Sequence, residues 1–128
     1  RLRPLVQAGG HQAERLVPVL AAWDLSVLVS SSSTRCVQTA TPYAAATGRR
    51  LDLRDVLSEE DATPDGVRTV VDELLHVRGG SLVCTHRPVL PAVWDALGVE
   101  EVRLPPAGML VVHHRKGRIV ATEQQALD

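Results

Sequence analysis

Phenylalanine is absent from this chain of 128 residues, and aromatic residues make up only 2% of it. The core must therefore be built mainly from valine, leucine and alanine, since hydrophobic residues amount to 45%. The chain also lacks an excess of charge of either sign. The formal net charge is -1, which argues against a nucleic-acid clamp and against a polybasic membrane surface.

Cysteine is scarce: Cys36 and Cys84 are too few, and too far apart in the sequence, for a disulfide scaffold or a zinc site. We therefore expect no metal or other cofactor, and a reducing cytoplasm is the default location. No apolar run approaches the roughly 18 residues of a membrane span, and no signal peptide is visible. Because Met109 is the only methionine, we expect position 1 not to be a natural start.

Helical and strand-like segments alternate along the chain. Helices are predicted at residues 7–23, 35–47, from Thr63-Pro64-Asp65 to Gly79-Gly80, and from Pro88 to Leu97. Strands are predicted at 25–29, 51–56 and 81–85, and a terminal hairpin at 109–113 and 118–122. This order predicts one three-layer α/β/α domain over residues 1–128, with a mostly parallel sheet and a C-terminal antiparallel hairpin.

Two strand-to-helix turns repeat one design. Strand 25–29 leads into a serine-rich turn and Arg35, and strand 81–85 leads into His86. The carboxyl ends of parallel strands meet at one edge of a sheet, where helix N-termini attract anions. Arg35 offers a bidentate donor, and His86 offers a second donor or a proton shuttle. The sequence therefore predicts an anion pocket whose occupant is a phosphate ester.

Simpler interpretations exist for each of these residues. An arginine on a helix is most often solvated, and a histidine at a strand end is often only a hydrogen-bonded polar group. The serine run at 30–33 favours helix capping over catalysis, and no Gly-x-Ser-x-Gly motif is present. His113 and His114 should point to opposite faces of one strand. We interpret both of them, as well as His11 and His76, as structural or exposed, and Arg49, Arg50 and Arg54 as a solvated rim.

Four blocks form an ordered series along the chain. They are Arg3-Pro4-Leu5 with Gly9 and Gln12-Ala13, then residues 29–39 (V-S-S-S-S-T-R-C-V-Q-T), then Leu57-Ser58-Glu59, and finally Val83-Cys84-Thr85-His86. The second block is similar to the pattern V-x-S-S-P-x-x-R-x-x-Q-T. Together the blocks resemble the histidine phosphatase superfamily, also called phosphoglycerate mutase-like, over essentially the whole chain. The resemblance implies the phosphoglycerate mutase-like fold.

A narrower resemblance rests on residues 84–91 and 111–122. These segments are similar to the C-terminal domain of bacterial two-domain MutT-like Nudix hydrolases, in which a Nudix domain precedes a histidine phosphatase domain. This chain contains no Nudix box, so only the second domain is expected in it. The resemblance implies a Nudix domain in the full-length protein, a homodimer and a phosphate-bearing small-molecule substrate as partners.

The family resemblance implies a two-step phosphoryl transfer: a histidine attacks phosphorus, and water then releases phosphate from the phosphohistidine. Arg35 would bind the phosphoryl oxygens, His86 would be the second histidine, and Glu59 or else Glu60 would protonate the leaving oxygen. The nucleophile belongs to an R-H-G motif at the end of a central strand, which we expect upstream of residue 1. We therefore expect the 128 residues alone to be almost inactive and to leave neighbouring strands unpaired.

The resemblance, together with the predicted anion pocket, implies a metal-independent phosphohydrolase that acts on a phosphorylated small molecule, and by resemblance on a nucleotide. The alternative is a non-catalytic domain that supports folding, dimerisation or ligand sensing beside a Nudix domain. The residues encoded upstream of Arg1 distinguish the two hypotheses.

Overall fold

The computed structural model describes residues 3–8, 13–23, 25–104 and 109–125. They form a 6-stranded sheet in the order β3-β2-β4-β1-β5-β6. The strands are β1 (Arg3–Ala8), β2 (Leu25–Ser31), β3 (Leu51–Arg54), β4 (Gly80–Cys84), β5 (Met109–Arg115) and β6 (Arg118–Gln125). β1 to β4 run parallel, and β5 and β6 form an antiparallel hairpin. The predicted sheet type is confirmed.

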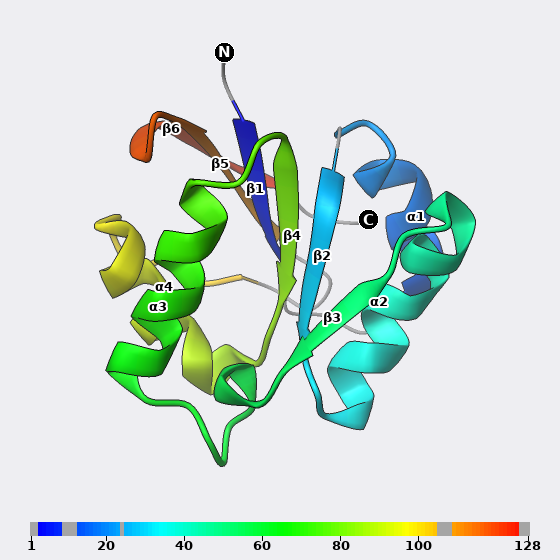
Figure 1. The fold of residues 1–128 in the computed structure, drawn as a ribbon, viewed down its shortest axis with the longest axis horizontal. Coiled ribbons are helices and arrows are strands. Elements are labelled where there is room, and N and C mark those ends of the chain that lie inside the picture. Colours follow the sequence, from blue (N-terminus) through cyan, green and yellow to red (C-terminus); the bar gives the residue numbers. More distant parts are fainter. Residues whose placement is uncertain (1–2, 9–12, 24, 105–108, 126–128) are drawn as a thin grey trace.

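Helices cover both faces of the sheet, as Figure 1 shows. They are α1 (Ala13–Leu20), α2 (Thr34–Thr47), α3 (Pro64–Leu75) and α4 (Leu90–Leu97), with two short 3-10 turns at Asp55–Leu57 and Arg87–Val89. α1 and α2 lie on one face, and α3 and α4 lie on the other (Figure 1). The predicted three-layer α/β/α architecture is therefore confirmed. None of the helices in the described ranges is long and apolar enough to span a bilayer.

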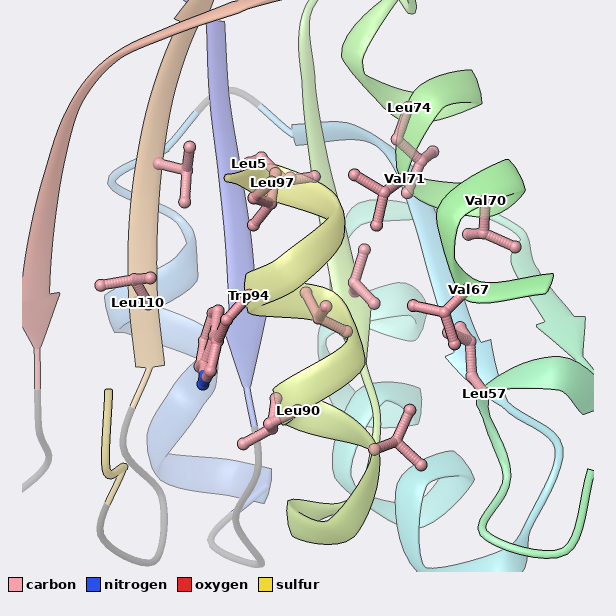
Figure 2. Packing of buried hydrophobic residues seen from close by; sticks show 14 of the residues in the cluster. Leu5, Leu57, Val67, Val70, Val71, Leu74, Leu90, Trp94, Leu97 and Leu110 are labelled. Atoms are coloured by element: carbon pink, nitrogen blue, oxygen red, sulfur yellow. The ribbon is translucent and has the colours of Figure 1, made fainter. Parts of the chain in front are cut away.

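Alternate side chains of the strands enter two separate cores. Val29 and Val83 pack in the core on the α3 and α4 side, where Figure 2 shows Trp94 and the leucines and valines around it. Leu28 and Leu82, one position earlier in each strand, enter the other core with residues of α1 and α2. This alternation follows from the two-residue period of a strand, and it is why strands covered on both faces are apolar throughout.

Local signals fix several helix ends where the sequence predicts them. The Thr63 side chain accepts a hydrogen bond of 3.0 Å from the backbone N–H of Gly66, and so caps α3. Gly48 and Gly98 end α2 and α4 with φ of 70°, a left-handed conformation that costs glycine little. These ends determine where α2 gives way to β3, where α3 begins and where α4 stops.

The N-terminal helix prediction is confirmed in its middle and wrong at its start. The helical spacing falls within α1, but α1 begins at Ala13, and residues 7 and 8 belong to β1 (Arg3–Ala8), which pairs with β4 on one side and β5 on the other. The two backbone ladders hold this segment as a strand. β4 and β5 are therefore not left unpaired, contrary to the expectation of a vacant central position. His11 lies outside the described residues.

Candidate active site

A small cavity of about 230 Å³ lies beyond the carboxyl ends of β2 and β4. The residues that line it all have polar or charged side chains: Ser33, Arg35, Glu59, Glu60 and His86. The two strand-to-helix turns singled out in the sequence therefore meet at one site, together with both candidate acids. Parallel strands produce this convergence, because their carboxyl ends all lie at the same edge of the sheet.

Ser33 connects the start of α2 to the end of β4. It occupies the N-cap position of α2 with φ of -71° and ψ of 149°, yet its side chain makes no capping hydrogen bond. Instead its Oγ lies 2.6 Å from Nε2 of His86. The interpretation of the serine run as helix caps is therefore wrong for Ser33, whose hydroxyl orients the imidazole.

Ser31 is the centre of a buried hydroxyl network. Its Oγ lies 3.0 Å from Nε2 of His86 and 2.7 Å from Oγ of Ser58, and it accepts a hydrogen bond of 3.2 Å from the N–H of Ser33. Ser31 itself is fully buried at the end of β2. One side chain thus joins three segments that meet only in the folded chain.

The imidazole of His86 is held from both sides. Hydroxyl groups contact Nε2, while Oε1 of Glu59 lies 4.0 Å from Nδ1. The side chain of His86 is 11% exposed and that of Glu59 is 53% exposed. The histidine is therefore fixed by the protein, whereas the carboxylate can exchange protons with solvent.

The loop that carries Glu59 is anchored next to the same site. Thr85, the residue before His86, donates a hydrogen bond of 2.6 Å from Oγ1 to the carbonyl of Leu57. Ser58 adds its contact with Ser31. Glu59 and Glu60 follow directly and both line the cavity. Two buried hydrogen bonds therefore place these carboxyl groups near His86.

Arg35 extends from the first turn of α2 and is exposed. Among the described residues its guanidinium forms no ion pair, so its charge is available to an anion in the cavity. Arg54 differs: it bridges Asp52 at 3.0 Å and Glu73 at 2.6 Å, and these carboxylates raise its pKa. Arg54 is therefore not part of a merely solvated rim, although Arg49 and Arg50 are exposed, as predicted.

The two cysteines lie beside this site, which their distance in the sequence did not reveal. Both are buried free thiols, and Sγ of Cys84 donates a hydrogen bond of 3.8 Å to the carbonyl of Cys36. Sγ of Cys36 is 3.6 Å from Nε2 of His86. A side-chain interaction between the two thiols, separate from this backbone contact, lowers the pKa of Cys36, while the same interaction and burial raise the pKa of Cys84. The sequence did contain one sign of this proximity, since Cys36 follows Arg35 and Cys84 precedes Thr85, at the two predicted site turns.

The other described histidines lie away from the cavity. His76 is exposed, and its Nδ1 lies 2.8 Å from the carbonyl of Asp72. His113 is half-buried beside Trp23, whereas His114 is fully buried, so the two point to opposite faces as predicted. No group of three or more histidine, cysteine, aspartate or glutamate side chains in the described ranges is arranged to hold a metal ion.

A second, larger cavity of about 890 Å³ lies elsewhere, next to β3 and the C-terminal end of α2. Its lining includes Arg49, Arg50 and Asp52 but none of the candidate site residues. Its lining contains no histidine, which the expected phosphoryl transfer needs.

The chain is similar to known proteins both in sequence and in fold. The model of the histidine phosphatase superfamily (branch 1) matches residues 3–65. An 8-oxo-(d)GTP phosphatase of Mycolicibacterium smegmatis is 32% identical over 95 residues, which are 73% of this chain and 30% of that protein. The chain therefore spans less than a third of the length of this relative.

Solved structures share the fold at low sequence identity. Mycobacterial hydrolase 1 superimposes with a TM-score of 0.74 and 14% identity, with 98% of each chain covered. A mycobacterial glucosyl-3-phosphoglycerate phosphatase gives 0.71 and 14%, also with 98% of each chain covered. A phosphoglycerate mutase of Plasmodium falciparum gives 0.64 and 15%, covering 93% of this chain and 87% of the other. The chain belongs to the histidine phosphatase superfamily.

Proposed function

We propose that this domain hydrolyses a phosphorylated small molecule, and that the phosphoryl group binds in the cavity between Arg35 and His86. The observation that carries the proposal is the convergence of four groups on a cavity of about 230 Å³: a guanidinium with no ion pair among the described residues, an oriented imidazole and two carboxyl groups. Charge-assisted donors and a helix N-terminus stabilise phosphoryl oxygens, and a carboxyl group can supply the proton that the leaving group needs.

In the first step of the proposed mechanism, a histidine nitrogen attacks phosphorus and the ester P–O bond breaks. Glu59 gives its proton to the departing oxygen, with Glu60 as the alternative donor. Arg35 and His86 hold the other phosphoryl oxygens as their charge increases. The attacking histidine belongs to a segment upstream of residue 1, because the resemblance places it in an R-H-G motif that residues 1–128 do not contain.

In the second step, water attacks the phosphohistidine. The Glu59 carboxylate accepts a proton from that water, the P–N bond breaks, and inorganic phosphate leaves. Both steps need Glu59 to exchange a proton with its surroundings. Its exposure of 53% and its distance of 4.0 Å from Nδ1 of His86 support that role.

A nucleotide is the proposed substrate class. The support is the relative described as an 8-oxo-(d)GTP phosphatase, which is 32% identical over 95 residues. We also propose that the domain works beside a Nudix domain in a longer protein, with a homodimer as its assembly. A cytoplasmic location agrees with two buried thiols that remain free.

A second candidate function is ligand sensing without catalysis. The observation in its favour is that β1 occupies the centre of the sheet and its sequence, RPLVQA, contains no histidine. Of the described histidines, His86 alone lines the polar cavity. Its hydrogen bonds to two serines suit binding of phosphoryl oxygens rather than attack on phosphorus.

The deciding experiment compares residues 1–128 with a chain extended by its natural upstream segment. Hydrolysis of p-nitrophenyl phosphate and binding of inorganic phosphate are measured for both. We expect phosphate binding by both chains and turnover only by the longer one, with both properties lost in Arg35→Ala. Phosphate binding without turnover by either chain would favour ligand sensing, and equal turnover by both would reject an upstream nucleophile.

A further inference from the structure

A third cavity, of about 630 Å³, lies against α4 next to the candidate active site. It is lined by Arg87, Leu90, Pro91, Trp94, Glu101, Val102, Arg103 and Leu104. None of these residues has a part in the proposed phosphoryl transfer. The volume lies within the range of about 300–1,000 Å³ that is typical of small-molecule sites.

The floor and the rim of this cavity differ in chemistry. Leu90, Trp94 and Leu104 are 2–5% exposed and form an apolar floor. Figure 2 shows Leu90 and Trp94 extending from the same side of α4. Arg87, Glu101 and Arg103 are exposed and put charge around the opening. A ligand that fits this cavity needs a flat apolar body with polar groups at its edge.

The loop that contributes Glu101 to Leu104 to the cavity is held in place by hydrogen bonds. The indole N–H of Trp94 donates a hydrogen bond of 3.2 Å to the carbonyl of Val102. The carbonyl of Arg103 accepts a hydrogen bond of 3.2 Å from the side chain of Gln124 in β6. The segment that carries Glu101 and Arg103 is thus fixed against both α4 and the sheet.

The rim charges have no partners within the described part of the chain. Arg87, Glu101 and Arg103 form no ion pair there, whereas Arg68, on the neighbouring α3, lies 3.4 Å from Asp95. Two guanidinium groups and one carboxylate leave a net positive opening. Such an opening attracts an anionic ligand and still offers an acceptor for N–H groups.

The cavity and the phosphate site are adjacent through the backbone. His86 lines the polar cavity and Arg87 lines the larger one, and consecutive Cα atoms are about 3.8 Å apart. This adjacency is the basis for placing the phosphoryl group of one molecule against His86 and the rest of that molecule past Arg87. The polar cavity of about 230 Å³ suits the phosphoryl group, and the apolar one suits the group to which it is attached.

We propose that the cavity against α4 binds the base of a nucleoside phosphate, with Arg87 contacting the phosphate next to the one that is cleaved. The assignment of the neighbouring phosphate site rests on the proposed function. A nucleobase is planar, packs well on leucine and indole, and carries N–H and carbonyl groups at its edge for Glu101 and Arg103. A bare sugar phosphate would instead press hydroxyl groups against the apolar floor, which is unfavourable.

The test uses the 128-residue chain and nuclear magnetic resonance. The chain has 2 tryptophans and hence two indole N–H signals, and Trp23→Phe serves only to assign them. Guanosine, which carries no phosphate, is titrated first, followed by guanosine diphosphate and inorganic phosphate. We expect guanosine to shift the Trp94 signal saturably, and guanosine diphosphate to bind at least about ten-fold more tightly than guanosine.

A charge-matched pair of double variants tests the rim. Replacing Arg87 and Arg103 by alanine should weaken guanosine diphosphate binding about ten-fold and guanosine binding by only about three-fold, because Arg103 alone of the two contacts the base. Inorganic phosphate binding should stay within about two-fold. The control replaces Arg49 and Arg50, exposed arginines at the distant cavity, and should change none of the three affinities. Equal losses in both double variants would show that only net charge matters and would overturn the role of Arg87.

The possible failures are separable. Binding of inorganic phosphate at Ser33 and His86, with no response of Trp94 to guanosine, would reject the base site and leave the phosphate site standing. A saturable Trp94 response to guanosine with no phosphate binding would reject the proposed phosphohydrolase site and support the base site. If neither inorganic phosphate nor guanosine bound, both the phosphate site and the base site would be rejected.

Discussion

Ser33 Oγ lies 2.6 Å from Nε2 of His86, so the residue at the N-cap position of α2 holds the imidazole at the end of β4 instead of capping its own helix. Two segments 53 residues apart in the chain are joined by this contact. The helix gives up a capping hydrogen bond, which commonly contributes about 1 kcal/mol, and the site gains an oriented ring. This exchange is typical of functional sites, where local preferences yield to the geometry of binding.

Ser33→Ala should weaken phosphate binding about 5-fold, because a net hydrogen bond contributes about 1 kcal/mol. His86 would keep its contact with Ser31 but could tilt within the cavity. Isothermal titration of the 128-residue chain with inorganic phosphate measures the effect. Ser32→Ala is the control: Ser32 is exposed and donates a hydrogen bond of 2.5 Å to Asp55 instead. If both variants bound phosphate like the unsubstituted chain, the Ser33 contact would have no part in binding.

Glu59→Gln should slow hydrolysis of alkyl phosphates by about 100-fold in a chain that includes the upstream segment, since general acid catalysis commonly contributes 10²–10⁴-fold. Turnover of p-nitrophenyl phosphate, whose leaving group needs no proton, should change little. Steady-state rates on the two kinds of ester provide the measurement. Glu60→Gln is the matched variant from the same cavity. Loss of alkyl phosphate turnover in Glu60→Gln alone would move the role to that residue, and equal losses on both esters would make Glu59 structural.

Cys84→Ala should raise the pKa of the Cys36 thiol back toward its ordinary value of 9.0. The hydrogen bond with Cys84 favours the thiolate of Cys36, so its removal makes the proton harder to lose, and burial then acts unopposed by that contact. The ultraviolet absorbance of the thiolate, recorded against pH, gives the titration. Cys36→Ala is the complementary variant: it removes the contact that raises the pKa of Cys84 most, so this pKa should fall but stay above 9.0 because the thiol is buried. An unchanged Cys36 midpoint in Cys84→Ala would show that another group lowers this pKa.

Leu5→Ala should destabilise the 128-residue chain by about 2–5 kcal/mol, the usual cost of emptying a buried leucine site. Leu5 is 0% exposed and lies in the central strand β1, whereas Leu53 in the edge strand β3 is 48% exposed. Leu53→Ala should therefore cost less than about 1 kcal/mol. Urea denaturation of the two variants gives the comparison. Similar small losses in both would contradict the position of β1 within the sheet.

The sequence by itself determined several helices and strands of this protein and its fold class, because these depend on local chemistry. The apolar period that marks Val67, Val71 and Leu74 requires only a helix with one buried face, and α3 has that face. The terminal hairpin follows from Lys116 and Gly117, whose φ values of 53° and 77° match the turn that joins two twisted strands. The alternation of such elements was sufficient for the fold class, because few arrangements bury both faces of a parallel sheet.

The sequence also determined part of the site, namely the meeting of Arg35 and His86. Arg35 and His86 each follow a buried strand, and parallel strands bring their carboxyl ends to one edge, so a shared cavity followed from topology before any distance was known. The positions of Glu59 and Glu60 depended on the family resemblance rather than on spacing. In the structure they are held by Thr85 and Ser31 through contacts with the preceding loop.

Tertiary structure decided the remaining features. The segment Arg3–Ala8 became the central strand because β4 and β5 offer backbone partners on both sides, and no property of the segment itself announces those partners. Cys36 and Cys84 became neighbours, and Ser33 turned toward His86, through contacts between segments about 50 residues apart. Sequence periodicity reports which face of an element is buried. Which elements then lie side by side is set by long-range pairing and packing, which exist only once the whole sheet has formed.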